Sequence, residues 1–189
     1  MATTKHTIVA LVEDKPGVLN RMASLFRRRG FNIESIAVGH SEIPNFSRMT
    51  IVVGGPSAMV EQVRKQLDKL VPTAKVSDIT GDEMVARELA LIKVKATSTT
   101  RSEIMQIVDI FRANIVDVAV DSLTVEATGD EDKIDSLLSL LRSFGIKEIS
   151  RTGRIALTRG SLSPLEVEPE SPRARSKSKK TTRELPEGS

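Results

Sequence analysis

The chain has 189 residues, which corresponds to one domain or two small ones. Its 28 basic and 25 acidic residues nearly cancel, so a net charge of +3 gives no argument for a nucleic-acid or membrane partner. The absence of cysteine excludes disulfides and a cysteine nucleophile, and the polar N-terminus and lack of a long apolar run predict a cytoplasmic protein.

The first half of the chain alternates between strand and helix patterns. Residues 6–13 are mostly apolar and predict a strand, and the spacing of apolar residues from 18 to 26 predicts a helix that Gly30 ends. Further strands are predicted at 31–38, 47–53 and 74–79, and a second helix at 57–70. The order strand, helix, strand, strand, helix, strand is that of a ferredoxin-like βαββαβ domain.

The same order recurs in the second half. Strand patterns cover residues 85–96, 115–120, 123–127 and 146–157, and capping boxes at Thr100 and Thr128 predict the starts of two helices. Residues 161–189 are instead rich in Ser, Pro, Lys, Arg and Glu, and bury too little apolar surface to offset the entropy of ordering. We therefore predict an α+β protein with two tandem ferredoxin-like domains, at 5–80 and 84–160, followed by a disordered tail.

The corner Asp14-Lys15-Pro16-Gly17 connects the first strand to the first helix. Pro is favoured in a first helical turn, Gly permits close approach to the backbone, and free N–H groups at a helix start suit a small anion such as a carboxylate. The alternative interpretation is that the corner only starts a helix. The second half has Thr97-Ser98-Thr99-Thr100 at the equivalent place, so the scaffold is repeated and this corner is not.

The sequence contains no group of residues typical of catalysis, metal binding or base stacking. His6 and His40 are the only histidines and lack the spacing of metal ligands, so we assign no catalytic and no metal-binding residue. RNA-binding ferredoxin-like modules stack bases on strand aromatics, and residues 48–53 contain none. The basic residues 27–29 and 173–180 are interpreted as a helix end and a solvated tail.

Several separated motifs resemble the small, regulatory subunit family of acetolactate synthase (acetohydroxyacid synthase) across residues 6–160. They are residues 13–21 (EDKPGVLNR), 25–35 (LFRRRGFNIES), 47–51 (SRMTI), 65–71 (KQLDKLV), 87–94 (RELALIKV) and 110–112 (IFR). The resemblance implies that the first half is an ACT domain that pairs side by side with a second copy, and that the effector binds at the interface between the two. It also implies a small subunit without catalytic activity that activates a catalytic large subunit and makes it sensitive to valine or another branched-chain amino acid. Thiamine diphosphate, magnesium and FAD belong to that large subunit, and this chain is expected to hold no cofactor.

The resemblance also implies where the effector binds. Carried over to this sequence, the effector site comprises Asp14, Pro16, Gly17, Val18, Leu19, Asn32 and Ile33. Many bacterial relatives have Asn in place of Asp14, so the polar contact there is expected to be charge-assisted. Ile43 and Phe46, in a loop at 39–46 that looks exposed, are expected with Arg48 to contact the large subunit.

Two other function classes stay open at this point. One is a free-standing amino-acid-binding regulator, although no helix-turn-helix is found outside the two repeats. The other is a small enzyme, against which the lack of an acid–base or nucleophile cluster counts.

Overall fold

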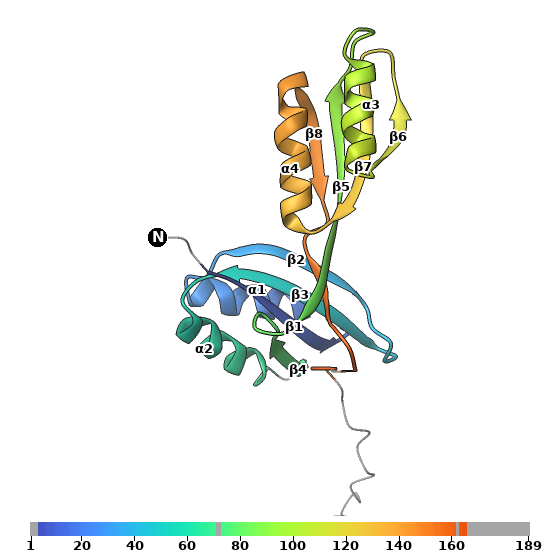
Figure 1. Ribbon diagram of the computed structural model, residues 1–189. Helices are drawn as coiled ribbons and strands as arrows, with labels where there is room; N and C mark the ends of the chain where they lie inside the picture. The colour runs from blue at the N-terminus through green and yellow to red at the C-terminus, as the bar shows by residue number, and fades with distance from the viewer. Residues whose placement is uncertain (1–3, 71–72, 162, 166–189) are drawn as a thin grey trace, which may run out of the picture.

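The computed structural model describes residues 4–70, 73–161 and 163–165. The first domain contains β1 (Lys5–Glu13), α1 (Val18–Arg28), β2 (Ile33–His40), β3 (Phe46–Gly54), α2 (Ser57–Leu67) and β4 (Thr73–Asp78). Its antiparallel sheet has the order β2-β3-β1-β4, with both helices on one face (Figure 1). This topology confirms the predicted ferredoxin-like fold.

The apolar run in β1 is explained by burial on both faces of the sheet. Ile8 and Ala10 face the helices and pack with Phe26 of α1 in the main core of the domain. Val9 and Leu11 point to the opposite face, where they pack in a separate cluster. The second face is therefore covered too, by chain that comes from much later in the sequence.

The second domain repeats the arrangement. It contains β5 (Met84–Lys95), α3 (Arg101–Ile110), β6 (Asn114–Val118), β7 (Ser122–Gly129), α4 (Glu131–Leu141), a short 3-10 turn η1 (Arg142–Phe144) and β8 (Ile146–Arg151). The sheet order β6-β7-β5-β8 matches that of the first domain strand for strand. The sequence repeat is therefore a structural repeat, and both domains of the α+β prediction are confirmed.

The two domains are joined by a two-stranded ribbon. β5 is long and runs from the first domain up into the second (Figure 1), and its first residues, Met84 to Arg87, pair with β9 (Ile155–Thr158). The extended segment predicted at 146–157, with Gly153 as its interruption, is thus two strands. It splits at Gly153 into β8, which pairs within the second domain, and β9, which returns to the first.

The ribbon supplies the cover for the second face of the first sheet. Ala156 packs with Val9, Leu11 and Ile79, and Met84 and Ala86 contact the same cluster. Leu165 also belongs to this cluster and is 2% exposed, although the sequence analysis placed it in the tail. The rest of the predicted tail, residues 166–189, lies outside the described residues.

The helix starts differ in detail from the sequence expectations. α1 begins after Pro16, with Gly17 as its N-cap residue, so Pro16 is not in the first helical turn. Thr100 precedes α3 but its hydroxyl accepts from the N–H of Thr97, so the expected capping box is not formed. In α4 the cap is Asp130, whose carboxylate accepts from the N–H of Lys133, and Thr128 lies in β7.

Candidate functional site

The corner between β1 and α1 is a tight turn with its glycine in the left-handed region. The N–H of Val18 lies 3.4 Å from the Lys15 carbonyl oxygen, and Gly17 has φ 84° and ψ −5°. These values are those of a type II turn with proline and glycine at its two central positions. Pro16 therefore sets the turn, and Gly17 allows the positive φ that the turn requires.

A small cavity of about 190 Å³ opens at this corner. It brings together five of the predicted effector residues, namely Asp14, Pro16, Gly17, Val18 and Leu19. Val38, Ser47 and Met49 line it as well, and the sequence analysis missed them. The signal that identifies them is the strand pairing of β1 with β3 and of β3 with β2, which places residues 38 and 47–49 beside the end of β1.

The corner has free backbone donors and a carboxylate, which are groups of the kind that bind the two charges of a small zwitterion. A Cβ added to Gly17 would meet no atom within 4 Å, so the backbone there is open to approach. Among the described residues, no acceptor bonds the N–H groups of Gly17 and Leu19. The Asp14 carboxylate is half exposed, 3.4 Å from the His40 ring nitrogen Nδ1. Backbone donors at a helix start suit a carboxylate, and Asp14 suits an ammonium group.

Asn32 and Ile33 are not part of this cavity. They lie at the start of β2, where Ile33 pairs with Val53, whereas the corner is next to the other end of β2, where His40 pairs with Ser47. A strand of this length spans roughly 20 Å or more. A single chain therefore does not bring Asn32 and Ile33 to the corner.

β2 is an edge strand with uncovered apolar side chains. Ile36 and Val38 pair with Ile51 and Met49, which belong to the helix-facing core, yet they are 40% and 46% exposed. Leu19, at the nearby start of α1, is 52% exposed. An unpaired strand edge beside exposed apolar side chains is a favourable site for pairing with another strand.

Ile43 and Phe46, which are expected to contact a large subunit, are less exposed than the sequence suggests. Ile43 and Phe46 are partly buried and pack against the cluster of Val9, Leu11 and Ala156, so the expectation that they are exposed is wrong. The hairpin tip looked exposed in the sequence because the ribbon that covers it comes from distant parts of the chain, with Ala156 108 residues beyond Arg48. Arg48 is half-buried, and its Nη2 donates to the Ala156 carbonyl oxygen at 3.0 Å.

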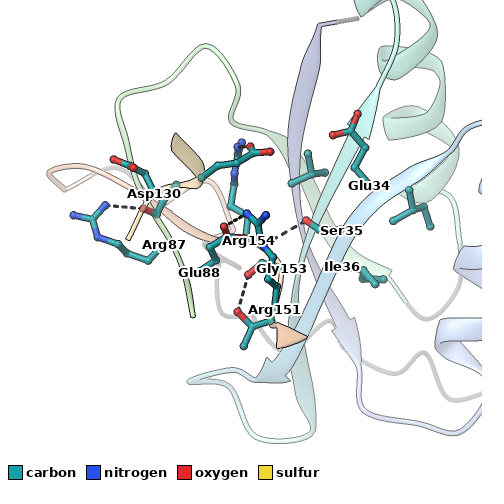
Figure 2. A pocket seen from close by; sticks show the side chains of 14 residues that line it. Glu34, Ser35, Ile36, Arg87, Glu88, Asp130, Arg151, Gly153 and Arg154 are labelled. Carbon is teal, nitrogen blue, oxygen red and sulfur yellow. Dashed lines mark hydrogen bonds and ion pairs between the residues drawn. The ribbon is translucent and has the colours of Figure 1, made fainter. Parts of the chain in front are cut away.

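A larger cavity of about 460 Å³ lies between the two domains (Figure 2). Residues 33–36 of β2 form one wall. Residues of the second domain and residues 152–154, the linker between β8 and β9, form the other. Acidic and basic groups mix there. Glu88 is 8% exposed and is held by Arg151, which also contacts Asp135 at 2.7 Å. The contact between the two domains at this cavity, called the joint below, is therefore charged, and its buried carboxylate, Glu88, is paired with Arg151.

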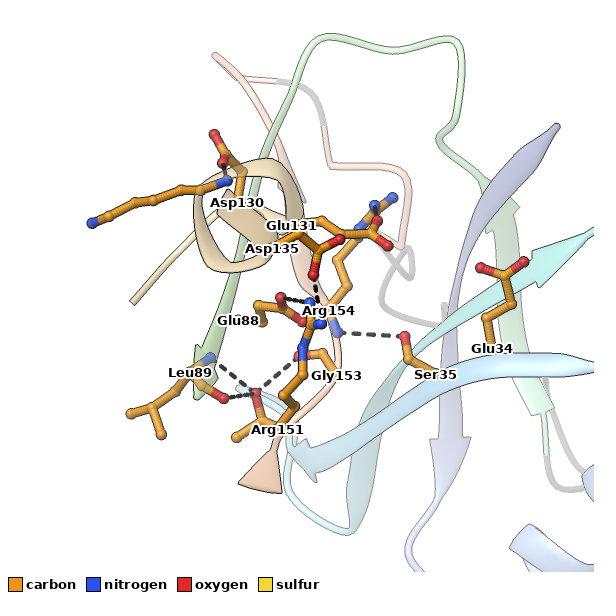
Figure 3. A network of polar contacts seen from close by, with 12 residues as sticks. Glu34, Ser35, Glu88, Leu89, Asp130, Glu131, Asp135, Arg151, Gly153 and Arg154 are labelled. Carbon is orange, nitrogen blue, oxygen red and sulfur yellow. Dashed lines mark hydrogen bonds and ion pairs between the residues drawn. The ribbon is translucent and has the colours of Figure 1, made fainter. Parts of the chain in front are cut away.

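A polar network crosses this joint through Glu131, the first residue of α4 (Figure 3). Its carboxylate accepts from Lys5 Nζ at 2.5 Å and from Arg154 Nη2 at 2.6 Å. Lys5 also contacts Glu34 of β2 at 3.2 Å. The hydrogen bond from Lys5 lowers the pKa of Glu131, and the same bond raises the pKa of Lys5. The second domain is therefore tied to β1 and β2 of the first.

The linker backbone completes this tie. The Arg154 N–H lies 3.4 Å from Ser35 Oγ, and Arg154 Nη1 donates to Thr7 Oγ1 at 3.0 Å. Gly153 has φ 80°, and a Cβ there would lie 3.0 Å from the Cβ of Ser35. The linker thus passes against β2 at a place where a side chain does not fit easily.

Within the described ranges, no three His, Asp or Glu side chains cluster as a metal site. None of the helices described is both long and apolar enough to cross a membrane.

Comparison with known proteins assigns both halves of the chain. Residues 8–75 match a family model described as the AHAS small subunit-like ACT domain, and residues 87–160 match one described as the small subunit of acetolactate synthase. The two matches coincide with the two structural repeats.

Relatives are similar over almost their whole length. A probable acetolactate synthase small subunit of Archaeoglobus fulgidus is 58% identical over 157 residues, covering 83% of this chain and 98% of the relative. The acetolactate synthase small subunit of Mycobacterium bovis is 52% identical over 160 residues, covering 85% and 95%.

A solved structure agrees in fold as well as in sequence. The crystal structure of the acetolactate synthase small subunit from Thermotoga maritima superposes with a TM-score of 0.77 at 42% identity, covering 84% of this chain and 99% of that one. From its repeated fold, its ACT domain and these relatives, the chain belongs to the acetolactate synthase small subunit family.

Proposed function

We propose that this protein is the regulatory subunit of acetolactate synthase in branched-chain amino acid biosynthesis. It binds the catalytic large subunit, activates it, and confers inhibition by valine or a related amino acid. The observation that carries the proposal is the corner cavity, where five of the seven residues expected to bind an effector line one opening in an ACT domain.

The effector site is completed by a second copy of the chain. Antiparallel pairing of two β2 edges about a two-fold axis places the start of one strand beside the end of the other. Asn32 and Ile33 of the second copy then lie next to the corner, which accounts for their distance from it within one chain. The exposed side chains of Ile36, Val38 and Leu19 support this pairing, since a dimer would cover them.

The corner suggests a role for each group. The effector carboxylate accepts from the N–H groups near Gly17, and its ammonium group donates to Asp14 or to Asn32 of the second copy. Val18, Leu19 and Ile33 of the second copy surround the side chain. Valine has two methyl-sized groups more than alanine, worth about 0.8 kcal/mol each, so roughly a tenfold preference for valine over alanine is expected.

The catalytic chemistry belongs to the partner. Thiamine diphosphate, magnesium and FAD belong to the large subunit, in the cytoplasm. The effector changes the activity of the complex because it binds two states of the complex with different affinity. A free-standing ACT regulator of another protein is the alternative, and it predicts no effect on acetolactate synthase.

Reconstitution tests the proposal. The acetolactate synthase catalytic subunit of the same organism is assayed alone, with the native chain, and with Gly17→Asp, each with and without valine. We expect both chains to activate the catalytic subunit, and valine to inhibit only the complex with the native chain. In Gly17→Asp the added carboxylate fills the place of the effector's carboxylate and repels it. Failure of the native chain to change the rate would contradict the regulatory role.

A further inference from the structure

The ribbon formed by the start of β5 and β9 is apolar on both faces, and one face is bare. Ala86 and Ala156 pack against the sheet of the first domain. Val85, Ile155 and Leu157 alternate with them and point the other way, with exposures of 37%, 57% and 60%. Strands that are apolar on both faces are typical of strands covered on both faces. The bare face is therefore built to be covered.

A groove of about 380 Å³ runs beside this bare face. Its lining is largely apolar, with Ala37 and Val38 from β2 and Val85, Ile155 and Leu157 from the ribbon. The pairing of Arg87 with Ile155 places a guanidinium on the same face as the apolar side chains. The groove lies between the ribbon and residues of β2 and β3, and Ala156 of the buried cluster also lines it.

The ionisable side chains that line the groove are of one kind. They are Arg48, Arg87 and His40, and no carboxylate is among the lining residues. Burial lowers the pKa of Arg48 and the charge of Glu42 partly opposes this, but Glu42 does not line the groove. Arg87 Nη1 donates only to the adjacent Ala86 carbonyl oxygen, and within the described ranges no carboxylate pairs with it. A partner surface that carries a carboxylate would match this groove.

We propose that this groove is the docking site of the acetolactate synthase catalytic subunit, through a segment that presents apolar side chains and at least one carboxylate. The inference rests on the proposed regulatory function and adds to it the surface and the chemistry of the contact. It replaces the hairpin tip, whose Ile43 and Phe46 are partly buried, but keeps Arg48 as a contact.

A second copy of the chain is a poorer occupant. A two-fold contact places the same patch on both sides of the interface, so Arg48 and Arg87 would face their own copies across a low-dielectric contact. The β2 edge is the self-complementary surface of the chain, because antiparallel strand pairing is symmetric about a two-fold axis.

The position of the groove connects docking to sensing. Val38 lines both this groove and the corner cavity, so an effector in the corner and a partner in the groove contact the same segment of β2. Any change that the effector makes in β2 therefore reaches the docking surface directly, and the coupling is reciprocal.

Two substitutions of different chemistry test the site. Arg87→Glu replaces one of the two guanidinium groups of the groove with a carboxylate, and Leu157→Ser removes an exposed apolar contact. The controls are Arg142→Glu on η1 and Leu140→Ser on α4, which are exposed and lie outside the groove. The readout is the concentration of the chain that gives half-maximal activation of the catalytic subunit of the same organism.

Each groove variant is expected to raise that concentration about tenfold or more, as for a central interface residue worth at least 1.4 kcal/mol. The controls should stay within about twofold of native. Thermal unfolding and the mass in solution without the catalytic subunit should match the native chain for all four variants.

The inference is overturned if the groove variants activate like the native chain. It is also overturned if they change the mass of the small subunit alone, since a second copy would then cover the groove. If the native chain itself does not activate, the proposed function fails and the docking site with it.

Discussion

The two domains share one scaffold but differ at the corner between the first strand and the first helix. In the first domain the corner is Lys15 to Val18, with Gly17 at φ 84° and an open backbone. In the second it is Thr97 to Thr100, where Thr100 has an ordinary φ of −99°. Gly17 and Thr100 are both N-cap residues, so they occupy equivalent positions.

The difference lies in what the corner leaves free. The hydroxyl of Thr100 accepts from the N–H of Thr97 and contacts the hydroxyl of Thr97 at 3.0 Å, so side chains satisfy the second corner from within. Gly17 has no side chain, and among the described residues no acceptor bonds its N–H group or that of Leu19. A repeated fold therefore carries a candidate sensor in one copy and a closed corner in the other.

Removal of core packing from the second domain should separate stability from sensing. Leu137→Ala removes a fully buried side chain and should destabilise the second domain by about 2–5 kcal/mol. Effector affinity, measured by calorimetry well below the unfolding temperature, should stay within about twofold. A large loss of affinity without unfolding would mean that the sensor extends into the second domain.

A methyl group at the first corner tests the need for glycine. Gly17→Ala should cost roughly 1–2 kcal/mol, because an L-residue is strained in the left-handed region, although no atom obstructs the added Cβ. Thr100→Ala, the matched change, loses a hydrogen bond at an exposed turn and should cost about 1 kcal/mol or less. Chemical denaturation of both variants measures these differences, and equal costs would show that the corners are not distinct in strain.

The polar network between the domains should give the smallest effect. Glu131→Gln weakens two partly exposed ion pairs and should cost roughly 0.5–1 kcal/mol, whereas Glu103→Gln on α3 should cost less. The lowered pKa of Glu131 means that its contribution is present above its ordinary pKa of 4.5 and is lost as the pH falls below that value. The difference in unfolding free energy between native and Glu131→Gln should therefore be full at pH 7 and should shrink as the pH is lowered below 4.5.

Much of the fold was accessible from the sequence because each element carries a local signal. The apolar run of β1, the amphipathic α1 and α2 and their repetition gave the order of elements and thus the sheet topology. Leu25-Phe26-Arg27 and Ile110-Phe111-Arg112 end equivalent helices, and Phe26 and Phe111 pack in equivalent cores.

What the sequence did not give depends on contacts between distant residues. The pairing of β9 with β5 and the burial of Leu165 against Val9 and Leu11 join segments that lie far apart in the sequence. Ile43 and Phe46 looked exposed for the same reason. Asn32 and Ile33 are a different case, because the second copy that the proposed site needs is implied by the family resemblance and not by the residue pattern of one chain.

The most direct test of the account is calorimetric titration of valine into the native chain, Gly17→Asp and Thr100→Asp. We expect the native chain and Thr100→Asp to bind valine alike, since Asp is a favoured N-cap residue, and Gly17→Asp to show no binding. Leucine and isoleucine titrated into the native chain would rank the effectors. Retention of binding by Gly17→Asp, or its loss in Thr100→Asp alone, would contradict the assignment of the sensor to the first corner.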